Sequence, residues 1–187
     1  IDVGPAVLDK AMGSIAVNLE RQVKKGSVLE GDAKAALARI AAAGALNAAA
    51  GADIVVEAVP ERFELKREVF EKLDAVCPPA AILASNTSSL PITRLAALTK
   101  RPQKVVGMHF MNPVPVMKLV ELIRGVETSD ETFDAVKALA LTLGKSPACS
   151  ADYPGFISNR ILMPMINEAV FALMEGVATK EDIDTVM

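Results

Sequence analysis

The sequence predicts an α/β protein with a parallel, doubly wound sheet. Short apolar segments rich in β-branched residues alternate with longer segments whose apolar residues recur every three or four positions. Strands that alternate with helices of this length are typical of parallel sheets covered by helices on both faces. Apolar residues make up 51% of the 187-residue sequence, which is enough for a folded core.

In the N-terminal part, the spacing of apolar residues predicts the end of a strand followed by two helices. Residues 1–3 have the pattern of a strand end, and the apolar spacing predicts amphipathic helices over 5–25 and 32–43. Gly26 and Gly44 follow these two helices as stop signals.

The middle of the chain predicts strands separated by helices. The run 53–59 has the continuous apolar, β-branched character of a strand that is buried on both faces. The same patterns, with flanking glycines and prolines, predict a helix over 60–76, a strand over 81–85, a short helix with Pro91 in its first turn, strands over 104–110 and 118–123, a helix over 132–143 and a strand over 145–151.

The C-terminal part predicts a helix over 154–175 with a wide apolar surface. Such a surface needs burial on more than one side. Thr179, followed by acidic residues, is expected to cap a further helix that is still running at Met187. We therefore expect the sequence to be cut at both ends. No apolar run approaches the roughly 20 residues that span a bilayer.

Charge and cysteine content exclude several classes of function. A net charge of −3 provides no basic surface for nucleic acid or for an anionic membrane. Two cysteines and one histidine are too few for a disulfide framework or a four-ligand zinc site, so we expect no metal. The low cysteine content favours a reducing compartment.

The single histidine, His109, is the first candidate for chemistry because it lies near the end of a predicted strand. Ligands bind at strand ends in open α/β sheets, and an imidazole exchanges protons near neutral pH. If the flanking strands form an antiparallel hairpin centred on Pro115, Glu121 lies directly opposite His109. A carboxylate inside an apolar strand is costly unless it is paired. The alternatives are a histidine bonded within a loop and a glutamate that faces water from an edge strand.

Three other positions are weaker candidates. The loop 85–89, Ser-Asn-Thr-Ser-Ser, holds more hydroxyls than capping of the next helix needs, so it either serves as a cap or contacts a ligand. Asn159 lies near the start of the last long helix. Asp2 lies where a nucleotide-binding unit places a ribose-binding carboxylate, but the glycine fingerprint that comes about 20 residues earlier would precede residue 1.

Three motifs carry a resemblance to a known family. They are SNTSSLPIT at 85–93, GMHFMNPVPVMKLVE at 107–121 and PGFISNR at 154–160. In this order and spacing they resemble the 3-hydroxyacyl-CoA dehydrogenases, with the short-chain bacterial 3-hydroxybutyryl-CoA type as the most similar. The resemblance extends over essentially the whole chain.

The resemblance implies a Rossmann-type NAD-binding domain over 1–152 that lacks its first strand. The start of an all-helical domain, which forms a homodimer and contributes to the substrate site, would follow over 153–187. The implied reaction is the oxidation of a short-chain (3S)-3-hydroxyacyl-CoA to the 3-ketoacyl-CoA, or the reverse. NAD is the implied cofactor, with NADP still open. We expect the bacterial type to act in the cytoplasm, and an organelle stays open.

The resemblance also assigns roles to individual residues. His109 would be the general base for the 3-hydroxyl, and Glu121 would orient and charge it. Ser88 and Asn159 would hold the substrate oxygen and the imidazole geometry. The residues implied near NAD are Asp2, Glu61, Lys66, Ser88 and Asn112, and those implied near the CoA are Asn18 and Lys25.

Two other functions stay open on the sequence alone. One is a non-catalytic, crystallin-like relative with the same fold. The other is a hydroxyacid dehydrogenase that does not use CoA. The set formed by His109, Glu121, Ser88 and Asn159 argues against the first, because a purely structural role does not require it.

Overall fold

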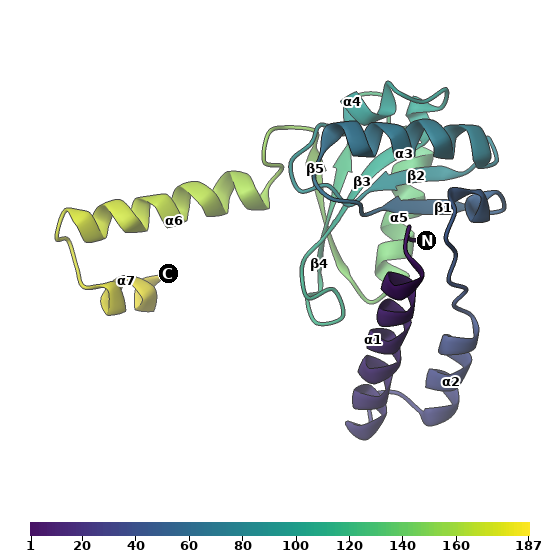
Figure 1. Ribbon diagram of the computed structural model, residues 1–187. Helices are drawn as coiled ribbons and strands as arrows, with labels where there is room; N and C mark the ends of the chain where they lie inside the picture. The colour runs from purple at the N-terminus through teal and green to yellow at the C-terminus, as the bar shows by residue number, and fades with distance from the viewer. The chain divides into compact units, whose positions relative to one another are not determined.

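The computed structural model describes every residue from Ile1 to Met187. Its contacts divide the chain into two compact units, one formed by Ile1–Ala52 with Val76–Pro78 and the other by Asp53–Ala75 with Pro79–Met187. The first unit is helical, whereas the second contains the sheet (Figure 1).

The first unit contains helices α1 (Pro5–Lys24) and α2 (Glu30–Ala38) and the short 3₁₀ helix η1 (Leu46–Ala49). Pro5 lies in the first turn of α1, where its missing N–H removes no helical hydrogen bond. Gly26, with a φ of 71°, follows the end of α1 and so confirms the predicted stop.

Two predictions for this unit are wrong. Ile1–Val3 do not form a strand end, because a single backbone hydrogen bond, from Asp2 N to Ala43 O at 3.1 Å, replaces the ladder that a strand requires. Helix α2 ends at Ala38, well before the expected residue 43. The amides of Arg39 and Ile40 bond to carbonyls three residues back and so tighten the last turn.

The second unit is built around a five-stranded sheet with the order β1-β2-β3-β4-β5. Its strands are β1 (Ile54–Glu57), β2 (Ile82–Ser85), β3 (Val105–Phe110), β4 (Leu119–Arg124) and β5 (Ser146–Ala151). β1, β2 and β3 are parallel, β4 is antiparallel to β3, and β5 is parallel to β4. The sheet is therefore mostly parallel. Its one antiparallel pair, β3 with β4, arises because the short connection 111–118 permits a hairpin but not a crossover.

Four strand ends lie together along one edge of this sheet. The carboxyl ends of β1, β2 and β3 lie there because these strands run the same way, and the amino end of β4 joins them through the hairpin. Open α/β sheets bind their ligands outside the carboxyl ends of the strands.

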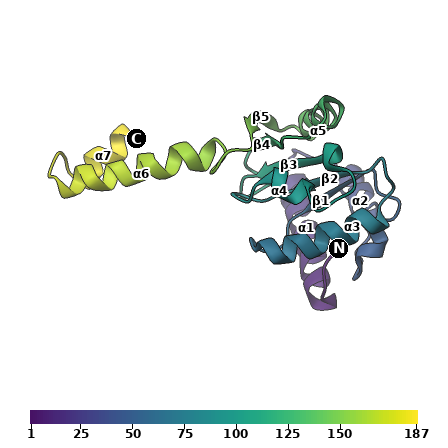
Figure 2. The ribbon, with the colours of Figure 1, turned by 90° about the horizontal axis from the view of Figure 1, so that it is seen from above.

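Helices cover both faces of the sheet, as predicted. α3 (Phe63–Val76) and α5 (Asp130–Thr142) lie on opposite sides of it in Figure 2. The core between the sheet and α5 is formed by Ala84, Val106, Met108, Val120, Leu122, Phe133, Val136 and Ala140. Because strand residues alternate between faces, His109 and Glu121 lie on the face turned away from α5.

Gly107 lets the short helix α4 (Ile92–Ala96) pack closely against this second face. A Cβ atom at Gly107 would lie 2.7 Å from Cβ of Ile123 and 3.0 Å from Cδ1 of Ile92. Packing at the density of a protein interior leaves no room for such an atom, so the fold requires glycine here.

The cap of α4 comes from a distant part of the chain. Pro91 is the N-cap residue, with a ψ of 123°, and not a member of the first turn as predicted. The amides of Ile92 and Thr93 donate to the carboxylate of Asp152 at 3.0 and 2.7 Å. The helix therefore begins where Asp152 can satisfy its first N–H groups.

The C-terminal segment forms helices α6 (Ser158–Met174) and α7 (Lys180–Val186). α6 begins later than predicted because Gly155 and Phe156 have left-handed φ values of 78° and 50°. Thr179 caps α7 as predicted, with the amide of Asp182 donating to its hydroxyl at 3.2 Å. No residue of α6 is buried, and none of the helices is both long and apolar enough to span a membrane.

Candidate active site

His109 and Glu121 face each other across the β3–β4 hairpin. The register pairs the two residues directly, and His109 Nδ1 lies 2.8 Å from Glu121 Oε2. Their side chains are 9% and 1% exposed, respectively. The pairing predicted from the position of Pro115 is confirmed. Neither alternative, a histidine bonded only within a loop or a glutamate facing water, describes the structure.

The Glu121 carboxylate is fully hydrogen-bonded. Oε2 accepts from His109 and from the Ser158 hydroxyl at 2.7 Å, and Oε1 accepts from the amides of Ile157 and Ser158 at 3.0 and 2.8 Å. Burial raises the pKa of Glu121, but the hydrogen bonds from Ser158, His109 and Ile157 outweigh it and hold the pKa below its ordinary value. Glu121 is therefore an anion at neutral pH.

The carboxylate fixes the tautomer of the imidazole. Because Glu121 accepts at Nδ1, the neutral His109 carries its hydrogen there and presents a lone pair at Nε2. Nε2 makes no hydrogen bond within the protein. The pair can therefore take a proton at Nε2, and the adjacent negative charge stabilises the imidazolium that results.

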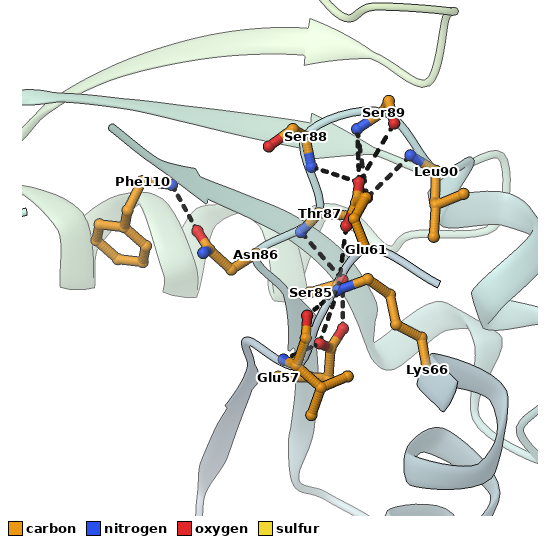
Figure 3. A network of polar contacts seen from close by, with 11 residues as sticks. Glu57, Glu61, Lys66, Ser85, Asn86, Thr87, Ser88, Ser89, Leu90 and Phe110 are labelled. Atoms are coloured by element: carbon orange, nitrogen blue, oxygen red, sulfur yellow. Dashed lines mark hydrogen bonds and ion pairs between the residues drawn. The ribbon is translucent and has the colours of Figure 1, made fainter. Parts of the chain in front are cut away.

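The hydroxyl-rich loop after β2 wraps around the carboxylate of Glu61, as Figure 3 shows. Glu61 Oε1 accepts from the Thr87 hydroxyl and from the amides of Ser88 and Ser89 at 2.9 and 3.1 Å. Burial raises the pKa of Glu61, but the bonds from Thr87 and Ser88 and the charge of Lys66 hold it below its ordinary value. An internal anion thus fixes the loop that carries Ser88.

A buried ion pair lies beneath this loop (Figure 3). Lys66 Nζ is 2.8 Å from Glu57 Oε1 and 3.3 Å from Glu61 Oε2, and the Lys66 and Glu57 side chains are almost completely buried. The Ser85 hydroxyl donates to Glu57 Oε2 at 2.7 Å. Sequence reasoning placed Glu61 and Lys66 at the site and singled out the loop 85–89, which contains Ser85 and Thr87, but it gave Glu57 no role. The available signal was Glu57 itself, a carboxylate inside an apolar strand, as Glu121 is.

Two contacts join the motifs that are far apart in the sequence. Asn86 Oδ1 accepts from the amide of Phe110 at 2.8 Å, which ties the loop after β2 to the end of β3. Asn159 Nδ2 donates to the carbonyl of Ser88 at 2.9 Å, which ties the same loop to the start of α6. Ser158, the neighbour of Asn159, bonds Glu121, which in turn bonds His109. One connected group therefore contains all four predicted residues: Ser88, Asn159, Glu121 and His109.

The remaining predicted residues lie outside this group. Asn112 is exposed in the turn that follows β3. Asp2, Asn18 and Lys25 are exposed residues of the first compact unit, and the Asp2 carboxylate accepts from the neighbouring amide of Val3 at 2.7 Å.

The polar groups left without a protein partner at this edge suit a dinucleotide. The Ser88 hydroxyl, the Asn86 amide nitrogen and His109 Nε2 make no hydrogen bond within the protein, although all three side chains are at least partly buried. They lie at or just beyond the carboxyl ends of parallel strands, where dinucleotides bind in doubly wound sheets. Hydroxyl and amide groups match the carboxamide and ribose hydroxyls of NAD.

Comparison with known proteins agrees with this geometry. Residues 1–153 match the family model described as 3-hydroxyacyl-CoA dehydrogenase, NAD binding domain, and residues 155–187 match the 3-hydroxyacyl-CoA dehydrogenase, C-terminal domain. The chain is 53% identical over 186 residues to a 3-hydroxybutyryl-CoA dehydrogenase of Bradyrhizobium diazoefficiens, covering 100% of this chain and 64% of that protein. It is 49% identical over 135 residues to human mitochondrial hydroxyacyl-coenzyme A dehydrogenase, covering 72% of this chain and 43% of that protein.

A solved structure has the same fold. The crystal structure of (S)-3-hydroxybutyryl-CoA dehydrogenase from Ralstonia eutropha superimposes with a TM-score of 0.93 at 47% identity, covering 97% of this chain and 64% of that one. The chain therefore spans slightly less than two thirds of the length of these bacterial relatives.

Proposed function

Because the chain belongs to the 3-hydroxyacyl-CoA dehydrogenase family, we propose that the protein oxidises a short-chain (3S)-3-hydroxyacyl-CoA to the 3-ketoacyl-CoA, or catalyses the reverse reaction. The observation on which the proposal depends is the buried His109–Glu121 pair, with Nε2 of His109 unoccupied by any protein group. Both alternatives, a non-catalytic relative and a hydroxyacid dehydrogenase that does not use CoA, are less favoured by the names of the relatives.

His109 acts as the general base in this proposal. Nε2 takes the proton of the 3-hydroxyl while the carbonyl forms and the hydride leaves C3 with its bonding electron pair. Glu121, held by Ser158 and by the amides at the start of α6, orients the ring and stabilises the imidazolium. General-base catalysis of this kind contributes roughly 10²–10⁴ in rate.

Ser88 and Asn159 position the reacting oxygen. The Ser88 hydroxyl is free to donate, whereas its backbone is fixed by Glu61 and by Asn159. A donor held in place before the substrate arrives needs no reorganisation in the transition state. Ser88 would therefore hold the 3-oxygen, and Asn159 would keep Ser88 at the correct distance from the imidazole.

NAD, when bound, supplies the acceptor for the hydride that leaves C3. The residues that would lie near it in the sheet-containing unit are Glu61, Ser88 and Asn112, together with Lys66, whose buried ammonium would act through Glu61. Asp2, in the first unit, would accept hydrogen bonds from a ribose and would repel the 2′-phosphate of NADP. We therefore propose NAD as the preferred cofactor. Asn18 on α1 and Lys25, directly after that helix, would contact the CoA moiety.

The proposal extends to the domain organisation. Residues 1–152 would form the NAD-binding domain, and 153–187 the start of a helical domain that completes the substrate site and pairs two copies. The exposed apolar side chains of α6, Ile161, Met165, Val170 and Phe171 among them, support such a pairing. The bacterial origin of the relatives supports a cytoplasmic location.

The test is an assay of NADH oxidation by the full-length protein that includes this chain, with acetoacetyl-CoA and with free acetoacetate. We expect turnover with acetoacetyl-CoA and little with acetoacetate, and slower turnover with NADPH. Oxidation with neither substrate would favour the non-catalytic relative. Equal rates with both would favour the dehydrogenase that does not use CoA.

A further inference from the structure

Ser158 is a polar residue at the site that the sequence reasoning did not single out. It is the first residue of α6, and its hydroxyl donates to Oε2 of Glu121 at 2.7 Å. The same oxygen accepts from His109 Nδ1 at 2.8 Å. Two donors thus share one carboxylate oxygen, and one of them is the imidazole.

The backbone before α6 brings Ser158 to this position. Gly155 has a φ of 78°, and Phe156, which is not a glycine, has a φ of 50° in the left-handed region. A non-glycine residue in that region is uncommon and costs conformational energy. The turn aims the amides of Ile157 and Ser158 at Oε1 of Glu121, so the carboxylate lies at the N-terminus of a long helix.

From this geometry we propose that Ser158 is a positioning residue that moderates the basicity of His109 through Glu121. The inference rests on the proposed role of His109 as general base. A hydroxyl that donates to Oε2 draws charge away from the lone pair that the imidazolium would bind. The Ser158 hydroxyl therefore weakens the hold of Glu121 on the protonated ring, and it keeps a larger fraction of His109 neutral at a given pH.

No other ionisable group bonds to His109. The one ion pair of His109 is with Glu121. The imidazole also lies near the aromatic ring of Phe156, in the turn before α6, with the two ring centroids 6.3 Å apart. The other ionisable groups on the adjoining segments are Arg94 on α4, Lys118 and Arg124 on the β3–β4 hairpin, Asp152, Tyr153 and Arg160 before and in α6, and Glu61, which the loop after β2 binds. Of these, Arg124 pairs with Asp130, and the Asp152 carboxylate caps α4.

The test is a titration of His109 by the NMR signal of its imidazole ring. The ring is identified because its signal disappears in His109→Gln. In Ser158→Ala, the loss of the competing donor should raise the midpoint of the titration by less than about one pH unit. Ser158→Thr, which keeps the hydroxyl, should leave the midpoint unchanged, and Ser158→Cys, a weaker donor, should give an intermediate value.

Ser150→Ala is the matched control, because this hydroxyl bonds only to the carbonyl of Ala151. An unchanged or lowered midpoint in folded Ser158→Ala would overturn the proposal. If Ser158→Ala does not fold, the comparison of the other two variants decides: the proposal requires a higher titration midpoint in Ser158→Cys than in Ser158→Thr. Equal midpoints in those two variants would also overturn the proposal.

Kinetics give an independent result. In the oxidation direction, the acidic limb of kcat/KM against pH should move to higher pH together with the titration midpoint in Ser158→Ala, and it should stay at the wild-type position in Ser158→Thr. A uniform loss at every pH would indicate a purely structural role and would contradict the proposal. If wild-type protein forms no NADH, the proposed function fails, and the titration still decides the role of Ser158.

Discussion

Replacing Glu121 by glutamine tests how much the buried carboxylate contributes to catalysis. The glutamine side chain keeps an oxygen of the same shape for the two amides at the start of α6, but the change removes the negative charge 2.8 Å from His109. A hydrogen bond to a charged group is worth about 1.5–3 kcal/mol, and that bond is strongest when the imidazole is protonated. At about 1.36 kcal/mol for each factor of ten, kcat should fall about tenfold to roughly 150-fold.

The assay measures kcat for the oxidation of a (3S)-3-hydroxyacyl-CoA, the direction in which His109 gains its proton in the transition state, and, separately, the thermal midpoint of unfolding. Glu131→Gln is the matched control, since Glu131 is 83% exposed and pairs only with Lys104 at 3.4 Å. We expect the control to keep wild-type turnover. A folded Glu121→Gln protein with less than threefold loss of kcat would refute the reasoning, because it would show that the charge is not used in the transition state.

Three further changes test the structure itself. Lys66→Met leaves Glu57 buried without its ion pair and should lower the free energy of unfolding by about 3–5 kcal/mol, with partial recovery when Glu57→Gln is added. Urea denaturation of the single and double variants measures both effects. Gly107→Ala places a methyl group 2.7 Å from Ile123 Cβ and should cost about 1–3 kcal/mol in the same measurement; an unchanged stability would show that Ile123 on β4 and Ile92 on α4 can both move aside freely. The pKa of Glu121 is lower in the folded protein than its ordinary value of 4.5, so the stability that it contributes is present above that pH and is lost as the pH falls through the lower, folded-state value. Between about pH 7 and about pH 3.5, the free energy of unfolding should therefore fall less in Glu121→Gln than in the wild type, and equal losses would contradict this account.

Much of the fold follows from patterns that are local in the sequence. The strands and the helices of the second unit were predicted because apolar residues repeat with a period that distinguishes the two structures. The predicted strand at residues 1–3 and the predicted end of α2 were wrong. The first depended on a distant bond, from Asp2 N to Ala43 O, and the second on the amides of Arg39 and Ile40, which close the last turn of the helix by bonding three residues back.

The sequence alone determined the central pair of the site. His109 and Glu121 are twelve residues apart, and a hairpin centred on Pro115 leaves one register that sets them opposite each other. Hairpin geometry is local, so the residue numbers were sufficient to predict the contact.

Only the tertiary structure decided how that pair is held. Ser158 bonds Glu121 across 37 residues of sequence, and Ser85 bonds Glu57 across 28. These contacts exist because the strand ends share one edge and because the left-handed turn at Gly155 and Phe156 directs α6 toward it. No local periodicity encodes such positions, since they result from the packing of segments whose relative placement is fixed only when the chain has folded.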